Sequence, residues 1–235
     1  MYLGIDSVPS NTDIDFTAIR GSNYKYSIKV TQINCNTDDE TMKDLRAPRG
    51  CLQYFPESGG TIQSFNYDGV NAYSTNQDYS ICIARSAKNC GIKYTNPPVD
   101  GSKARSVGAA TQNGCRAGST SSGSPDSGCG EDCLKVSGST AAPTDSDWLT
   151  IAGGQLADAD LADASSYKAF FCGQGLGEDT NSTANGVNGD GVLDFSNGPF
   201  IVRFHADSVK PEETAGKITD DVGFVIDYAV QTGKC

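Results

Sequence analysis

Nine cysteines constrain this 235-residue chain more than any other feature of its sequence. They are spread along the chain, at positions 35, 51, 82, 90, 115, 129, 133, 172 and 235. Structural zinc sites use closely spaced pairs, and only Cys129 and Cys133 lie close together here. A framework of disulfides is the better interpretation, and it predicts an oxidising, extracellular compartment. Because the count is odd, one cysteine is free or pairs with something outside the chain.

Alternation of apolar and polar residues predicts an all-β chain. In residues 200–207 Phe200, Val202 and Phe204 fall on one face, with Arg203 and His205 on the other, and residues 224–230 and 26–33 repeat this pattern. A period of two is typical of a strand in a sheet with one buried face. Shorter strands are expected in three further segments, at residues 80–85, 91–95 and 148–151.

Long polar segments separate these strands. Residues 118–128 and 179–191 are rich in glycine, serine and asparagine, so we expect loops there. Residues 155–167 fit one short helix. The predicted architecture is an antiparallel β-sandwich with long loops and disulfides.

Charge excludes several functions. The net charge of -11 and the isoelectric point of about 4.4 repel phosphate backbones, so we expect no nucleic-acid partner and no anionic membrane surface. No apolar run approaches the roughly 18 residues of a membrane helix, so no membrane span is expected. The first ten residues have no basic region followed by an apolar one, so they do not form a signal peptide. Asn181 begins a sequon for N-glycosylation, which suits an extracellular protein.

A boundary is expected between the strand that ends at Cys35 and the residues that follow Cys51. The segment between them is charged and contains a proline, and we interpret residues 36–49 as a linker. The residues before it supply about two strands, too few to bury a core of their own. They either dock on the following domain or belong to a neighbouring one.

From Gly50 onward the sequence resembles CUB domains. Gly50-Cys51, GTIQSFNYDG (60–69) and YSICI (79–83) are similar to the family's opening, in which a cysteine is followed by G-x-I-x-S-P-N-Y-P and a second cysteine within a strand. Phe65 replaces the family's proline. Later matches follow in the family's order, at DWLTI (147–151), Phe171-Cys172-Gly173, PFIVRFHAD (199–207) and GFVIDY (223–228). The resemblance implies a CUB-like jelly-roll sandwich over residues 50–235.

The first 50 residues resemble the junction between tandem CUB domains in secreted arthropod proteins. By that resemblance residues 1–35 are the late strands of a preceding CUB-like domain, and the partner of Cys35 lies upstream. The alternative is an N-terminal extension docked on a single domain, with Cys35 bonded to Cys51.

The resemblance also implies disulfides. It pairs Cys51 with Cys82, and it pairs Cys172 with a cysteine near the family's D-Y segment. Residues 129–138 resemble that segment too, so either Cys129 or Cys133 can be the partner of Cys172. A further pair is expected between Cys90, which opens a strand, and Cys235, which follows the last one.

Many CUB domains bind calcium between the loops at one end of the sandwich. Transferred to this chain, the family's ligands become Asp100, Asp147 and Asp207, with Asp132 as a rival for Asp147. Calcium prefers several hard oxygen ligands supplied by different loops. The alternative is that these residues are solvated acids in a chain that has 29 of them.

We do not expect an enzyme, because the only histidine, His205, lies on a strand and no activated-serine motif is present. The expected function is a secreted module that binds an extracellular protein or glycan through an acidic, calcium-ordered loop end. Two alternatives are a carrier of a small apolar ligand, such as a lipid or pigment, and an oligomeric structural subunit of an extracellular assembly.

Overall fold

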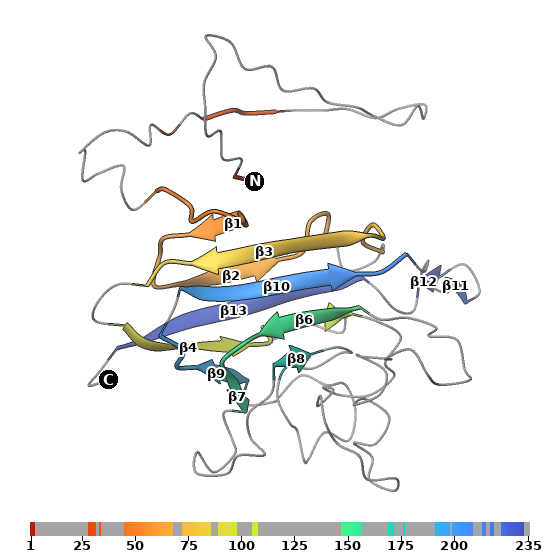
Figure 1. Cartoon of the computed structure of the whole chain (residues 1–235). Coiled ribbons are helices and arrows are strands. Elements are labelled where there is room, and N and C mark those ends of the chain that lie inside the picture. Colours follow the sequence, from red (N-terminus) through yellow and green to blue (C-terminus); the bar gives the residue numbers. More distant parts are fainter. Residues whose placement is uncertain are drawn as a thin grey trace, which may run out of the picture.

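Two β-sheets pack face to face in the computed structural model of this chain (Figure 1). The model describes residues 1–2, 28–31, 33, 45–67, 72–85, 89–97, 105–107, 147–156, 169–171, 176, 191–197, 199–208, 213–214, 217–218 and 222–232. No residue within these ranges is helical. The all-β sandwich predicted from the sequence is confirmed.

The five-stranded sheet has the order β1-β3-β10-β6-β8. Its strands are β1 (Cys51–Phe55), β3 (Gln77–Ile83), β10 (Phe200–Ala206), β6 (Trp148–Ile151) and β8 (Phe170–Phe171). β1 runs parallel to β3, and the other pairs in this sheet are antiparallel.

The six-stranded sheet has the order β2-β13-β4-β9-β7, with β5 paired to β13 beside this path. Its strands are β2 (Gly59–Gln63), β13 (Gly223–Thr232), β4 (Asn89–Thr95), β9 (Val192–Asp194), β7 (Gly154–Leu156) and β5 (Arg105–Ser106). The short strands β11 (Glu213–Thr214) and β12 (Lys217–Ile218) form a separate antiparallel pair.

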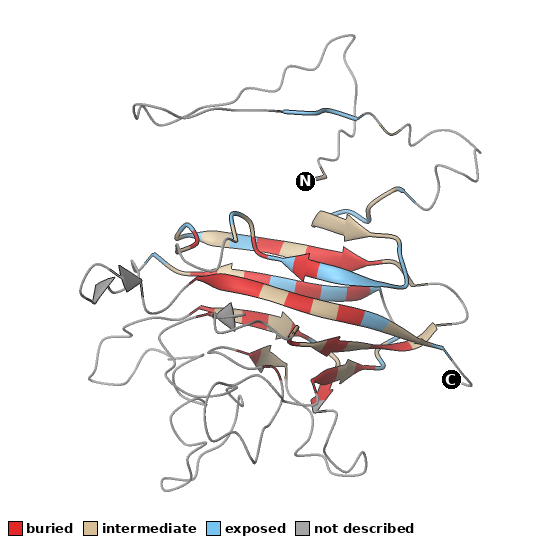
Figure 2. Cartoon of the chain, turned by 180° about the vertical axis from the view of Figure 1, so that it is seen from behind, coloured by how far each residue is buried: buried red, intermediate tan, exposed pale blue. Residues whose placement is uncertain are grey.

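The core lies between the two sheets. Phe200, Val202 and Phe204 of β10 point inward as the alternation predicted, and so do Phe224 and Ile226 of β13. Figure 2 shows the alternation as bands of buried and exposed residues along the long central strands. Each such side chain removed from water contributes roughly 1.5–3 kcal/mol, so these two strands hold the sheets together.

Aromatic rings concentrate around Phe204. Its ring centroid lies 5.0 Å from that of Tyr73, 5.4 Å from that of Tyr79 and 5.5 Å from that of Phe224. Tilted and edge-on arrangements of this kind add to the hydrophobic term. The cluster fixes the end of the sandwich at which β10 finishes.

Glycine is required at the beginning of β13, next to this cluster. Gly223 has a φ of 94°, a conformation that side chains rarely adopt, and an added Cβ would collide with Ser64 Oγ. That hydroxyl accepts a hydrogen bond of 3.2 Å from the amide of Phe224. The close approach joins β2 to the beginning of β13.

Two local predictions were wrong. Residues 28–31, expected within a strand, are irregular, and Ile28 and Val30 are 53% and 69% exposed. Alternation gives a strand only where a neighbouring strand supplies hydrogen bonds, and no described strand pairs with this segment. Gln155 and Leu156, expected in a helix, pair with β9 as part of β7. Residues 157–167 of the expected helix lie outside the described residues.

Candidate functional site

The loops at one end of the sandwich bring together residues that are far apart in the sequence. β10 is antiparallel to both β3 and β6, so the end of β10 lies beside the beginnings of those two strands. Asp207 follows β10, Asp147 precedes β6, and Tyr73 and Asn76 precede β3. The topology therefore places Asp147 and Asp207, two of the three predicted calcium ligands, next to each other.

Asp147 is held from two sides. Its side chain is buried, with only 4% exposed. The Tyr73 hydroxyl donates a 2.5 Å hydrogen bond to Oδ2, and the backbone amide of Asp207 donates a 2.6 Å hydrogen bond to Oδ1. These two donors orient the carboxylate of Asp147.

Asp207 links the same end to the loop before β3. Its carbonyl oxygen accepts a 2.6 Å hydrogen bond from the amide of Asn76. Asn76 has a φ of 56°, in the left-handed region that asparagine tolerates better than most residues. The backbone of Asp207 is thus fixed on both sides, by Asp147 and by Asn76.

An unsatisfied polar side chain lies at this end as well. Asn96 follows β4 and is 9% exposed, and neither its Oδ1 nor its Nδ2 has a hydrogen-bond partner. A buried amide without partners costs roughly 1–3 kcal/mol.

The donor set fits a calcium ion in part. Asp147 and Asp207 supply the hard oxygen ligands that calcium prefers, from two different strand ends. Asp100 and Asp132 lie outside the described residues. Among the residues that the structure describes, no three His, Cys, Asp or Glu side chains cluster in a way that could hold a metal. Asp100, the third predicted ligand, therefore stays a prediction.

The disulfide between Cys51 and Cys82 is present, with the two Cα atoms 5.6 Å apart. This excludes the alternative pairing of Cys51 with Cys35. Cys90 is also disulfide-bonded. Its partner lies outside the described residues, as do Cys129, Cys133, Cys172, Cys235 and the sequon at Asn181. The predicted pairings of these cysteines stay predictions.

His205 lies on the outer face of the five-stranded sheet, as its position in the alternating strand predicted. Its ring stacks on Trp148, with centroids 4.2 Å apart and planes inclined by 23°. Trp148 in turn contacts Phe170 edge-on at 6.1 Å. Beside them, Arg203 forms a bidentate ion pair with Asp78, at 2.7 and 2.5 Å.

Sequence reasoning missed Tyr73 and Asn76, the two residues that fix the loop end. Both lie in the loop between the matched segments at 60–69 and 79–83. A buried tyrosine hydroxyl needs a partner, and that requirement was the available signal.

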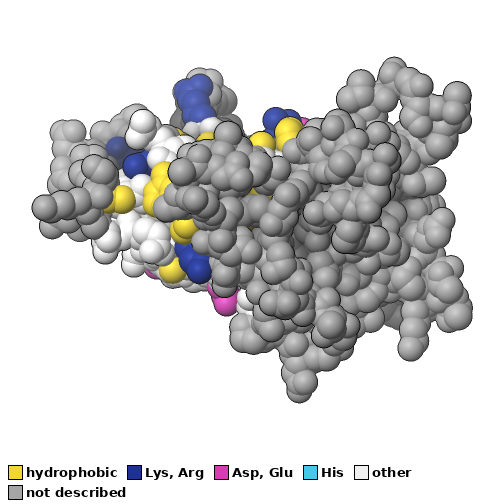
Figure 3. Space-filling model, turned by 90° about the horizontal axis from the view of Figure 1, so that it is seen from below, with side chains coloured by type: hydrophobic (Ala, Val, Ile, Leu, Met, Phe, Trp, Pro, Cys, Tyr) yellow, Lys and Arg dark blue, Asp and Glu magenta, His cyan; other side chains and the backbone are white. Residues whose placement is uncertain are grey.

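On another face, seen from below, the Lys and Arg side chains in view lie apart, with apolar side chains between them (Figure 3).

A family model matches most of the chain. The family model described as the animal CUB domain matches residues 48–231. A search of curated proteins found no matching relative. Within the described ranges, no helix has the length and apolar character needed to cross a membrane. Since the match covers most of the chain, and since the sandwich and the Cys51–Cys82 disulfide agree with it, this chain belongs to the animal CUB domain family.

Proposed function

We propose that this CUB domain binds a basic extracellular protein through its acidic loop end, and that calcium held by Asp147 and Asp207 orders that end. CUB domains are in general extracellular binding modules and are typically not enzymes. The observation that supports the proposal is the oriented carboxylate of Asp147, held by Tyr73 and by the backbone of Asp207.

The chemistry of the loop end suits calcium. When bound, a calcium ion would neutralise adjacent carboxylates and cross-link the loops that contribute them. Asp147 and Asp207 would hold it, with Asp100 as the third carboxylate. Tyr73 and the amide of Asp207 would fix the orientation of Asp147, as outer-shell donors do for metal-binding carboxylates.

The charge of the whole chain suits a basic partner. A net charge of -11 attracts a cationic surface and speeds its approach, and the attraction weakens as salt is added. A lysine side chain of the partner would then meet acceptor oxygens at the loop end. This favours a protein over a glycan as the partner, because most glycans offer no cationic group.

Calcium titration by calorimetry tests the proposal. We expect saturable binding to the wild-type chain and at least about tenfold weaker binding to Asp207→Asn, which removes one ligand charge and keeps the backbone hydrogen bonds. Asp227→Asn is the matched control, since Asp227 lies on β13 and accepts its hydrogen bond from Thr61. No saturable binding to the wild type, or equal losses in both variants, would contradict the calcium site.

The partner class is tested on a surface coated with a lysine-rich peptide. We expect retention of the chain in calcium and its loss in a chelator, in Asp207→Asn and on the acetylated peptide. Retention that does not change with calcium would reflect net charge alone and would contradict the proposed role of the loop end. The carrier and structural-subunit alternatives stay predictions from the sequence.

A further inference from the structure

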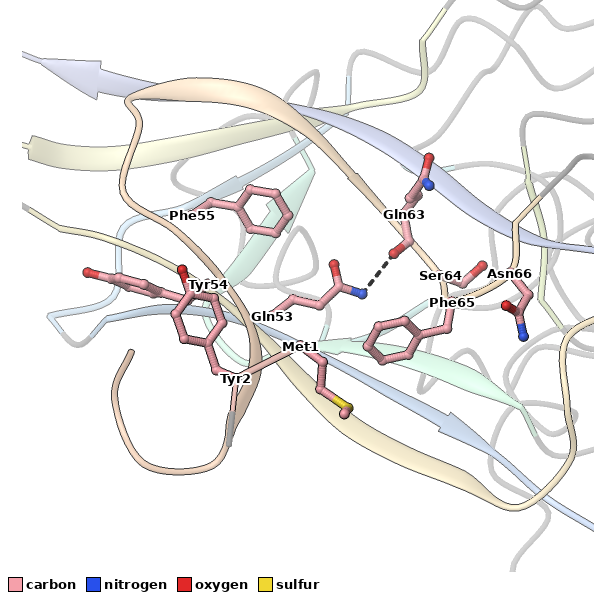
Figure 4. A pocket seen from close by; sticks show the side chains of 9 residues that line it. All are labelled: Met1, Tyr2, Gln53, Tyr54, Phe55, Gln63, Ser64, Phe65 and Asn66. Atoms are coloured by element: carbon pink, nitrogen blue, oxygen red, sulfur yellow. Dashed lines mark hydrogen bonds between the residues drawn. The ribbon is translucent and has the colours of Figure 1, made fainter. Parts of the chain in front are cut away.

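A hollow of ≈ 330 Å³ lies where the edges of the two sheets meet, at β1 and β2 (Figure 4). Phe55 and Phe65 stand on either side of it, and Gln53 reaches between them to donate a 3.0 Å hydrogen bond to the carbonyl of Gln63. The full lining is Met1, Tyr2, Gln53, Tyr54, Phe55, Gln63, Ser64, Phe65 and Asn66. None of these nine side chains is charged, although 20% of the residues in the chain are. The hollow therefore suits a neutral occupant.

The chain's first two residues lie over this hollow. The amide of Tyr2 donates a 2.8 Å hydrogen bond to the carbonyl of Leu52, and the Tyr2 ring contacts Tyr54 edge-on, with centroids 5.9 Å apart. Met1 lines the hollow but remains 71% exposed. The dipeptide therefore makes a backbone contact and a ring contact without filling the space beneath it.

β1 is an edge strand within the described residues, where it pairs with β3 alone. Its register on β3 is irregular between Cys51 and Gln53, so Leu52 has no partner residue on that strand. Edge strands offer carbonyl and amide groups to any extended segment that approaches them. Tyr2 uses one of these groups, the carbonyl of Leu52, in the manner of a peptide that adds to a sheet edge.

We propose that the edge of β1 and the hollow beside it form a docking site for a neutral extended peptide with an aromatic residue, and that Met1–Tyr2 occupies the site here. Backbone hydrogen bonds to β1 position the peptide, and a pocket at the sheet edge selects its side chains, as in other cases of strand addition. The site is separate from the calcium-binding loop end and does not depend on the proposed function.

Competition between the chain's own segment and an added peptide tests the proposal. The probe is a dye-labelled peptide with the sequence MYLG and both ends capped so that it is neutral, and fluorescence polarisation measures its binding to the full chain. In the variant Tyr2→Ala the ring contact with Tyr54 is lost, so we expect the probe to bind at least about fivefold tighter than to the wild type. Tyr2→Phe keeps the ring and is expected to exclude the probe as the wild type does.

Two controls make the outcome specific. A capped probe in which alanine replaces the tyrosine, MALG, should bind Tyr2→Ala at least about tenfold more weakly. Addition of a chelator, or the change Asp207→Asn, should leave probe binding unchanged. Tyr2 is a half-buried residue outside the core, so circular dichroism should show Tyr2→Ala folded. Absence of binding to that folded variant, or equal binding of the two probes, overturns the proposal.

Discussion

The imidazole of His205 stacks on the indole of Trp148 across the antiparallel pair of β10 and β6, with ring centroids 4.2 Å apart. These two residues are the only histidine and the only tryptophan of the chain. The pair is therefore an internal probe of the outer face of the five-stranded sheet.

Tryptophan emission should change when His205 is replaced. The imidazole of His205 covers part of the Trp148 indole, so His205→Ala should expose that ring to water and move its emission maximum to longer wavelength. A fluorescence spectrum at one fixed pH measures the change. An unchanged emission maximum in the folded variant would contradict the stacked geometry.

The ion pair between Asp78 and Arg203 should contribute little to stability. The Arg203 guanidinium lowers the pKa of Asp78 through its hydrogen bond, but the two side chains are 45% and 56% exposed. Because the pKa is lowered in the folded state, the contribution is present above the ordinary value of 3.8 and is lost as the pH falls below it. Asp78→Asn should cost no more than about 0.5 kcal/mol at pH 7 in urea denaturation. A loss above 2 kcal/mol would contradict this.

Tyr79 should make the fold sensitive to alkali. Burial raises the pKa of Tyr79 to about 12, whereas an unfolded tyrosine ionises near 10. The folded state holds the proton more tightly, so stability present below pH 10 is lost as the pH rises toward 12, by up to about 2 kcal/mol. Tyr79→Phe should lose about 1 kcal/mol at pH 7, because the amide of Phe65 loses its acceptor. Between pH 7 and pH 12 the variant should then lose less stability than the wild type, as measured by denaturation at each of these two pH values.

At neutral pH Tyr94→Phe should stabilise the fold, whereas Tyr79→Phe should destabilise it. The Tyr94 hydroxyl is fully buried without a hydrogen-bond partner, and burial raises its pKa well above 10. Removing an unsatisfied hydroxyl relieves its desolvation cost, so the free energy of unfolding should rise by about 1 kcal/mol. Tyr79→Phe is the matched comparison, since the same atom is removed from a tyrosine that has a partner. Equal destabilisation of both variants would contradict the unsatisfied state of Tyr94.

The Cys51–Cys82 disulfide should contribute roughly 3–4 kcal/mol to stability. It closes a loop with a sequence separation of 31 and ties the edge strand β1 to β3. By the chain-entropy model, closing a loop of this length lowers the entropy of the unfolded state, which corresponds to roughly 3–4 kcal/mol of stability. Replacement of both cysteines by alanine, followed by denaturant unfolding, measures the loss. An unchanged midpoint would show that β1 is held by its packing alone.

The sequence pattern predicted the strands β3, β4, β6, β10 and β13. Phe200, Val202 and Phe204 stand at every second position, and a period of two leaves only one arrangement in which a sheet buries all three. The same reasoning failed at Ile28 and Val30, where the period is present but no described strand pairs with the segment. The period states which face would be buried and says nothing about whether a partner strand exists.

The sequence by itself determined the sandwich class, the inward faces of β10 and β13, and the pairing of Cys51 with Cys82 through its resemblance to CUB domains. The tertiary structure alone decided that Tyr73 meets Asp147, 74 residues away, and that His205 stacks on Trp148. The physical reason is that side-chain periodicity is a local property of the backbone, whereas these contacts depend on strand order and register. Order and register arise from the packing of both sheets together, and no short segment of the chain encodes them.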